Sequence, residues 1–208
     1  MVLPLILSHR GRVILHTSVV SGPLGSVGFL ASTGTGKSTL AASLSLGGWQ
    51  VVADDSAVVE LDAGEVAVTA SYASVRLWPT SLKGLGLTHW RGVRVSPRSS
   101  KRRFFVADPG FRFCDQTVRL SRLYVLALYH DGSGVVSIDR LTSRDALMEL
   151  VKHAYTLDTD DRDQMRLHLD RLCRYGEVLD IRRLAYPLWF DRLTAVGKAI
   201  DADLRLTR

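Results

Sequence analysis

A glycine-rich segment, residues 31–39, constrains this chain more than any other part of its sequence. It reads Ala-Ser-Thr-Gly-Thr-Gly-Lys-Ser-Thr, follows the apolar stretch from Val27 to Leu30, and precedes an apolar-periodic segment that begins at Leu40. This is the strand–loop–helix setting of a Walker A phosphate-binding loop. Ala31, a small residue, stands where the motif has its first glycine. The pattern predicts an α/β core whose loop binds phosphate groups.

The residues of this loop have expected contacts with a nucleotide. Gly34 and Gly36 let the backbone curl until successive N–H groups point at an anion. The helix that follows adds the positive end of its dipole. Lys37 can reach the β- and γ-phosphates, and the Ser38 hydroxyl can bind Mg2+. We therefore expect ATP and Mg2+ as ligands. The nucleotide-binding residues expected from the loop are Ser32, Thr33, Gly34, Thr35, Gly36, Lys37, Ser38 and Thr39.

Size and composition indicate one globular domain. The chain has 208 residues, of which 46% are hydrophobic and 23% charged, enough for a sizeable core. Its formal charge of +6 favours anionic partners. The arginines are spread along the chain without an aromatic-interleaved basic motif, so nucleic acid is not an expected partner.

The sequence also suggests a location. No run approaches the ~20 apolar residues that span a bilayer, and the apolar residues 1–7 lack the basic start of a signal peptide. We expect a cytoplasmic protein without a membrane partner. The two cysteines, Cys114 and Cys173, have no metal-ligand spacing.

Apolar runs and turn residues predict the order of the elements. The expected strands are 13–15, 17–20, 26–30, 49–53, 58–61, 66–69, 104–106, 123–129 and 135–138, with turns at 21–25 and 131–134. The expected helices are 37–46, a short one starting near Arg76, one capped at 142–145, and those at 160–175 and 189–204, with a loop over 92–100. We predict an α/β fold with a P-loop nucleotide-binding core over residues 1–140 and a helical C-terminal part, 141–208, of the same domain.

A pair of aspartates, Asp54 and Asp55, ends the strand expected at 49–53. Because this strand follows the loop's helix directly, we expect it to neighbour the loop strand, in the position of a Walker B carboxylate. Adjacent strand residues point to opposite faces, so both aspartates reach the site only where the strand gives way to a loop. Beside Mg2+, they could divide metal binding from acceptance of a hydroxyl proton. In the alternative, one serves the metal and the other caps the next turn.

Other candidate residues are less specific. His16 lies on a strand before the loop, where a histidine more often belongs to the core than to a site. Arg76 and Trp78 are expected to be structural. Lys101 and Arg102 belong to a basic run that is either a solvated charge run or a means of neutralising nucleotide phosphates or docking an acidic substrate. The residues alone leave both interpretations open.

Taken together, three motifs resemble the catalytic domain of HPr kinase/phosphorylase and, more distantly, phosphoenolpyruvate carboxykinase. They are Leu15-His16, the loop at 31–39, and Val52-Ala53-Asp54-Asp55. The stretch 75–79, the Lys101-Arg102 pair and the closing helices more closely resemble the small HPr-kinase-like proteins encoded with lasso-peptide biosynthesis enzymes. Those kinases phosphorylate a seryl hydroxyl at the C-terminus of the precursor peptide.

The resemblance implies an ATP-dependent serine kinase of the HPr kinase / carboxykinase-like fold and assigns roles to its residues. It implies that Asp54 takes the seryl proton and that His16 orients this aspartate. Asp55 and Ser38 would support the metal, and Lys37 the phosphates. Lys101 and Arg102 would be further nucleotide contacts.

The implied substrate is a peptide or small protein with an acceptor serine, and the C-terminal serine of a lasso-peptide precursor is one candidate. Relatives in this family often assemble into oligomers, so a homo-oligomer stays open. Two alternatives also stay open on the sequence. One is a small-molecule hydroxyl kinase on the same core, and the other is a non-catalytic ATP-sensing module. Pure binding needs no proton acceptor, so Asp54 and Asp55 argue against the second alternative.

Overall fold

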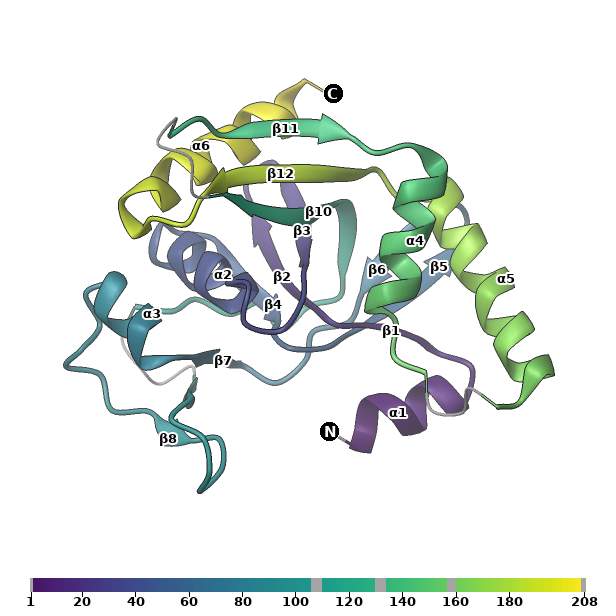
Figure 1. The fold of residues 1–208 in the computed structure, drawn as a ribbon, viewed down its shortest axis with the longest axis horizontal. Coiled ribbons are helices and arrows are strands. Elements are labelled where there is room, and N and C mark those ends of the chain that lie inside the picture. Colours follow the sequence, from purple (N-terminus) through teal and green to yellow (C-terminus); the bar gives the residue numbers. More distant parts are fainter. Residues whose placement is uncertain (1, 106–109, 130–133, 157–159, 207–208) are drawn as a thin grey trace.

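One long strand, β10 (Val118–Tyr129), organises the fold, as Figure 1 shows. Its first residues pair antiparallel with β6 (Glu65–Val68), and the rest lies parallel between β3 (Gly25–Leu30) and β12 (Ile181–Pro187). The structure is a computed structural model that describes residues 2–105, 110–129, 134–156 and 160–206. Because β10 takes part in both halves of the sheet, the sheet curls around it.

The described residues form a nine-stranded sheet and a smaller three-stranded one. The large sheet has the order β1-β5-β6-β10-β3-β2-β4, with β12 and then β11 added beside β10. Its other strands are β1 (Val13–Leu15), β2 (Thr17–Gly22), β4 (Gln50–Ala53), β5 (Ala57–Asp62) and β11 (Ser137–Arg140). The small sheet contains β7 (Ser74–Leu77), β9 (Arg102–Phe105) and β8 (Val93–Arg94) in that order.

Helices cover the sheet in two groups (Figure 1). α2 (Lys37–Leu46) and α6 (Leu193–Arg205) pack together over one core, which also includes Leu82 of α3 (Pro79–Gly84). α4 (Ser143–His153) and α5 (Arg162–Val178) pack over a second core with β1, β5 and β6. The remaining helical elements are α1 (Val2–His9) and the 3-10 turn η1 (Phe190–Arg192). Across the described ranges, no helix has the length and apolar character needed to cross a membrane.

The segment around the glycine-rich loop folds as its sequence predicts. The helix runs from Lys37 to Leu46 and ends at Gly47, whose backbone N–H donates to the Ser43 carbonyl, while the N–H of Gly48 donates to the Ser45 carbonyl. The capped helix start is also confirmed, because the Thr142 side chain accepts a hydrogen bond from the Asp145 N–H. Local sequence signals therefore suffice where a helix boundary depends on its own cap.

The expected neighbour of the loop strand is wrong. β4 does not lie beside β3, because β2 lies between them and pairs antiparallel with both. The physical reason is the tight turn between Gly22 and Gly25, which folds β2 directly back onto β3. The prediction placed β4 beside β3 because it follows the helix directly, and it overlooked that the hairpin already fills this position. Asp54 and Asp55 therefore approach the loop from β4, which β2 separates from β3.

Three local expectations also differ from the structure. Arg76 and Leu77 belong to strand β7, and the short helix begins only at Pro79, with Trp78 as its N-cap residue. Val2–His9 forms α1, whereas no helix was predicted before residue 37. Within the predicted loop 92–100, Val93–Arg94 pairs with β9. Residues 106 and 131–133, assigned to a strand end and a turn, lie outside the described residues.

The segment 141–208 contributes more than helices. Ile181–Pro187 forms β12, which joins the sheet beside β10. The last helix is preceded by η1, so α6 starts at Leu193 rather than at Trp189. The C-terminal segment thus supplies both a strand of the sheet and a helix of the first core.

A buried group of charges joins the C-terminal segment to β10. The Asp203 carboxylate of α6 forms ion pairs with Arg122 and Arg182, and accepts a hydrogen bond from the Tyr124 hydroxyl at 2.7 Å. Arg122 and Arg182 also pair with Asp180, each at 2.8 Å. Since Arg122 and Tyr124 belong to β10 and Arg182 to β12, this cluster fixes α6 to the sheet.

Candidate active site

The glycine-rich loop connects β3 to α2 in a curled conformation. Gly34 and Gly36 have φ angles of +89° and +102°, in the left-handed region that L side chains rarely adopt. A Cβ atom built on either glycine would meet no atom within 4 Å, so the backbone angle and not crowding requires glycine there. Gly36 caps α2 without a side-chain hydrogen bond, which leaves the first N–H groups of α2 available to an anion.

The side chain of Lys37 folds back over the loop that precedes it. Its ammonium donates hydrogen bonds to the carbonyl oxygens of Ala31, at 2.5 Å, and Ser32, at 3.2 Å. Lys37 is only 6% exposed, and burial lowers its pKa to about 8, against the opposing effect of Asp54 and Asp55. Lys37 is therefore positively charged near neutral pH, but it loses its proton at a lower pH than an ordinary lysine does.

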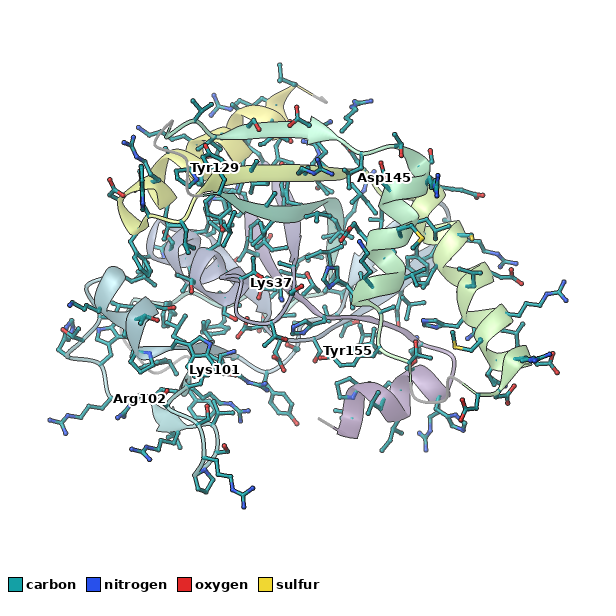
Figure 2. All side chains as sticks on the ribbon, in the orientation of Figure 1. Lys37, Lys101, Arg102, Tyr129, Asp145 and Tyr155 are labelled. Atoms are coloured by element: carbon teal, nitrogen blue, oxygen red, sulfur yellow. The ribbon has the colours of Figure 1, made fainter. Side chains whose placement is uncertain are left out.

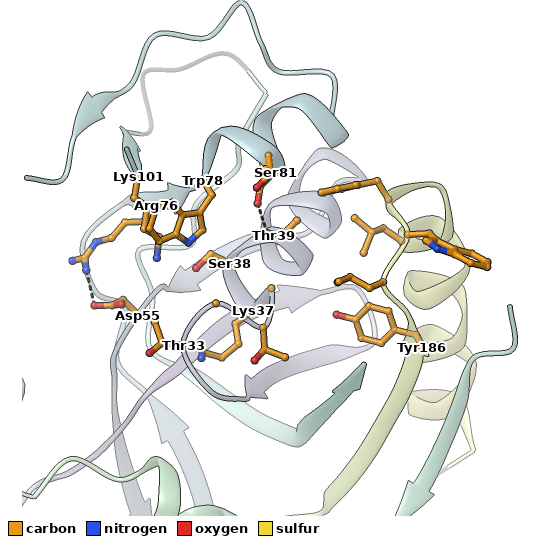
Figure 3. Close-up of a pocket in the computed structure, with 18 of the residues that line it drawn as sticks. Thr33, Lys37, Ser38, Thr39, Asp55, Arg76, Trp78, Ser81, Lys101 and Tyr186 are labelled. Carbon is orange, nitrogen blue, oxygen red and sulfur yellow. Dashed lines mark hydrogen bonds and ion pairs between the residues drawn. The ribbon is translucent and has the colours of Figure 1, made fainter. Parts of the chain in front are cut away.

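The loop opens on a cavity of about 310 Å³. It lies between the N-terminus of α2, the start of α3 and the chain after β12, as Figure 3 shows. The cavity is lined by His16, Thr33, Gly34, Thr35, Gly36, Lys37, Ser38, Thr39, Asp55, Arg76, Trp78, Thr80, Ser81, Lys101, Tyr186, Leu188, Trp189, Phe190 and Leu193. Of the loop residues predicted to bind nucleotide, all from Thr33 to Thr39 line it, whereas Ser32 does not.

The two aspartates after β4 have different surroundings. Asp54 is 8% exposed, and its Oδ1 accepts a hydrogen bond from the Ser18 hydroxyl at 2.7 Å. Its Oδ2 accepts from the backbone N–H of Arg76 at 2.9 Å. Asp55 instead lies on the cavity wall, and its Oδ2 pairs with the Arg76 guanidinium at 2.5 Å. Only Asp55 of the pair therefore lines this cavity directly.

Asp55 reaches the cavity through an unusual backbone conformation. Its φ angle is +78°, which is uncommon for a residue other than glycine and is tolerated best by aspartate and asparagine. Asp55 is the second residue after β4, which ends at Ala53. This agrees with the expectation that both carboxylates approach a site only where the strand gives way to a loop.

His16 lies between the aspartates and the loop. Its Nδ1 is 2.7 Å from the carbonyl oxygen of Asp55 and 3.3 Å from the Tyr155 hydroxyl. Because a carbonyl only accepts, Nδ1 carries the hydrogen, and the Nε2 lone pair faces the Thr33 hydroxyl at 3.5 Å. Burial, followed by the charge of Lys37, lowers the pKa of His16. The imidazole is thus neutral at pH 7 and supports the backbone of Asp55.

The two residues of the basic pair Lys101-Arg102 have different positions relative to the cavity. Lys101 lines the cavity, with its ammonium 5.9 Å from the centre of the Trp78 ring. Arg102, the first residue of β9, donates from Nη1 to the Gly92 carbonyl at 3.1 Å and is not among the lining residues. Figure 2 shows both on the β8 side of the molecule, away from its centre where Lys37 lies. Neighbouring residues of an extended chain point opposite ways, so only one of the two reaches the cavity.

A second cavity, of about 600 Å³, meets the first across the loop. The two share His16, Thr33 and Thr35. The second is also lined by Ala31, Ser32, Val125, Leu126, Glu149, Lys152 and His153. Burial lowers the pKa of His153, while the neighbouring Glu149 opposes that shift. Two cavities therefore meet at the loop.

Several lining residues were not recognised from the sequence. They come from the end of β12 and the segment that follows it, far along the chain from the loop: Tyr186, Leu188, Trp189, Phe190 and Leu193. No spacing motif links this segment to the loop, and Trp189 was assigned to a helix. Ser18 and Tyr155, which contact Asp54 and His16, also lacked a sequence signal.

The donor groups on the cavity wall are compatible with a Mg2+–nucleotide. Ser38 supplies a hydroxyl and Asp55 a carboxylate, which are oxygen ligands of the kind that Mg2+ takes together with phosphate oxygens. Among the described residues, no group of three or more histidine, cysteine or acidic side chains forms a metal cluster. Ser38 and Asp55 are thus suited to hold a metal jointly with phosphate oxygens.

Comparison with known proteins gives little beyond a likeness of shape. The sequence matches no protein-family model and no curated protein. Among solved structures, it is similar to that of the Hpr(Ser) kinase/phosphatase from Coxiella burnetii, with a TM-score of 0.49 and 10% sequence identity. The similarity covers 94% of this chain and 99% of that one. At this level, the likeness establishes neither a family nor a reaction.

Proposed function

We propose that this protein is an ATP-dependent kinase that transfers the γ-phosphoryl group to a serine hydroxyl of a peptide or small protein. One observation carries the proposal: Lys37, Ser38 and Asp55 line a single cavity at the mouth of the glycine-rich loop. These are a phosphate cation, a metal-binding hydroxyl and a carboxylate, which phosphoryl transfer requires together. The C-terminal serine of a lasso-peptide precursor is our candidate acceptor.

The chain's own residues would bind the nucleotide and its metal. The loop N–H groups and Lys37 would hold the phosphates, and for this the Lys37 ammonium must exchange the carbonyls of Ala31 and Ser32 for phosphate oxygens. Ser38 and Asp55 would hold Mg2+, which supplies charge neutralisation at the transferred group. Lys101 would add a second cation on the same wall.

We assign acceptance of the seryl proton to Asp54. It is buried just after β4, and its charge opposes the lowering of the Lys37 pKa. The hydrogen bonds from Ser18 and the Arg76 N–H orient its carboxylate, and each oxygen keeps a second lone pair. His16 would position the Asp54–Asp55 turn through the Asp55 carbonyl. The reverse assignment, with Asp55 as the base, is favoured by its place on the cavity wall.

The acceptor would approach from the second cavity. That cavity shares His16, Thr33 and Thr35 with the first, so a group placed there lies at the same end of the loop as the aspartates. Its volume of about 600 Å³ also suits a small molecule, which keeps a small-molecule hydroxyl kinase as the second candidate. A non-catalytic ATP sensor is the third candidate, and two carboxylates at the loop argue against it.

Phosphate transfer from labelled ATP tests the proposal. The protein is incubated with Mg2+ and γ-labelled ATP against a panel of serine-terminated peptides, with mass spectrometry to locate the added phosphate. We expect labelled peptide from the wild-type protein and from Asp62→Asn, an exposed hairpin variant, and none from Lys37→Met. Label on a metabolite but on no peptide would favour the second candidate. ATP binding without transfer to any acceptor would favour the sensor.

A further inference from the structure

The cavity at the loop has two chemically different ends. Figure 3 shows Asp55 and Tyr186 on opposite sides of Lys37, with Arg76 beside Asp55. The end near Asp55 is charged. The other end is formed by Tyr186, Leu188, Trp189, Phe190 and Leu193, which we call the apolar wall. A ligand that fills the cavity must therefore be polar at one end and apolar at the other.

Residues of the apolar wall are held in place by packing. Tyr186 and Leu193 are buried, and the Tyr186 hydroxyl points toward the loop in Figure 3. The Phe190 ring packs on α3 at Gly84, where a Cβ atom would lie only 2.2 Å from the ring. Glycine at position 84 thus leaves room for this ring at the mouth of the cavity. The packing holds Phe190 in place between η1 and α3.

Part of this wall remains open to the cavity. Leu188 is 50% exposed, and Trp189 and Phe190 are each 41% exposed. Three neighbouring large apolar side chains that line a cavity and remain half-exposed are a favourable contact surface for a flat, apolar ligand group.

From this arrangement we infer that the apolar wall seats the nucleobase of the bound nucleotide. The inference rests on the proposed function and extends it to recognition of the base. The loop and the N-terminus of α2 fix the phosphates in the middle of the cavity, and the carboxylates mark the end where the γ-phosphate must lie. The base, at the other end of the same molecule, then lies against residues 186–193.

The wall also determines how the base is recognised. Of the described residues that line the cavity, Asp55 is the single carboxylate, and it lies at the opposite end from Tyr186. Guanine is commonly selected by a carboxylate that accepts from its N–H groups, and the apolar wall offers none. Contact and stacking therefore hold the base, and they depend little on which purine is present.

Binding measurements by calorimetry separate the base from the phosphates. The ligands are ATP and inorganic tripolyphosphate, each with Mg2+, and no acceptor is needed. We expect ATP to bind more tightly than tripolyphosphate. Phe190→Ala should weaken ATP binding roughly tenfold and leave tripolyphosphate unchanged, because stacking on an aromatic ring is worth on the order of 1–3 kcal/mol per base.

Two further variants make the outcome decisive. Tyr72→Ala removes an aromatic side chain that is 79% exposed and does not line the cavity, and it should bind both ligands as the wild type does. Leu188→Ala, at a half-exposed position, should weaken ATP binding about threefold with little effect on folding. Equal affinity of the wild type for ATP and tripolyphosphate, or equal weakening of both by Phe190→Ala, would overturn the apolar wall as the base site. Failure of both ligands to bind would instead overturn the proposed function.

Discussion

Arg76 is bound to Asp55 through an ion pair of 2.5 Å between Nη1 and Oδ2, while its backbone N–H donates to the preceding Asp54. A single residue of β7 therefore holds both carboxylates of the candidate site. Since β7 belongs to the small sheet and the aspartates to the end of β4, the position of the small sheet determines where both carboxylates lie. The sequence predicted a structural role for Arg76. In the structure, Arg76 holds the two carboxylates of the candidate site.

The two aspartates should differ in their effect on stability. Asp54→Asn turns one accepting oxygen into a donor that faces either Ser18 or the Arg76 N–H, so we expect the free energy of unfolding to fall by about 1–3 kcal/mol. Asp55→Asn loses a partly exposed ion pair, keeps a residue type that tolerates a positive φ, and should cost only about 0–1 kcal/mol. Urea unfolding measures both values.

The same pair of variants tests the catalytic assignment. Loss of a general base reduces the rate by about 10²–10⁴-fold, so Asp54→Asn should lower kcat by this amount with the KM for Mg2+–ATP little changed. Asp55→Asn should mainly raise the concentration of Mg2+ needed for half-maximal activity. Full activity of Asp54→Asn at saturating Mg2+, with a large loss of kcat in Asp55→Asn, would transfer the base role to Asp55.

Nucleotide binding should depend on the charge of Lys37. Its pKa of about 8 means that the ammonium is present below pH 8 and lost above it. ATP affinity should therefore be steady near pH 7 and weaken roughly tenfold for each pH unit above 8. Calorimetric titration between pH 7.5 and 9.5 measures the slope. Lys37→Met should bind ATP weakly with no slope, and an unchanged slope in this variant would assign the titration to another group.

His16 should be neutral at pH 7, with its hydrogen on Nδ1. The contact with the Asp55 carbonyl requires that hydrogen, and burial keeps the pKa below the ordinary value of 6.5. Correlation of imidazole nitrogens with ring protons by NMR distinguishes the two neutral forms, and His16→Gln assigns the signals. A hydrogen on Nε2 at pH 7, or titration above pH 6.5, would remove the proposed support of the Asp55 turn.

The buried charge cluster should be essential for stability. Asp203→Asn leaves Arg122 and Arg182 without a full counter-charge in the interior, and breaking a buried ion pair costs about 3–5 kcal/mol. Asp201→Asn, on the same helix but partly exposed, is the matched control and should be close to neutral. Urea unfolding of the two variants gives the comparison. Equal stability would show that the cluster does not fix α6 to the sheet.

The sequence predicted most accurately what depends on nearby residues. The loop conformation at Gly34 and Gly36, the helix that begins at Lys37 and the cap at Thr142 are each set within a few residues, and all are confirmed. The strand neighbours were not predictable in this way. The hairpin between Gly22 and Gly25 gives β3 one neighbour, β2, but its other neighbour, β10, comes from a distant part of the chain and has no local signal.

The sequence predicted only the part of the candidate site formed by the loop and Asp55. Residues from Thr33 to Thr39 and Asp55 share a motif and a strand end, so their meeting in the cavity could be expected. The apolar wall could not, because Tyr186 and Phe190 reach the cavity only through the pairing of β12 with β10. Parallel pairing over a long chain separation leaves no periodic trace in the sequence. The roles assigned to the site residues all stay predictions: Asp54, Asp55, His16, Lys37, Ser38, Lys101 and Arg102.

The place of β12 beside β10 has a consequence for the newly made chain. Translation produces the glycine-rich loop early, whereas the facing wall arrives only once the segment around residue 190 has left the ribosome. Until then, one edge of β10 lacks its parallel partner and the first core lacks α6. A nascent chain thus has only half of the candidate site, so under the proposed function a nucleotide would stabilise the fold only once this last segment is in place.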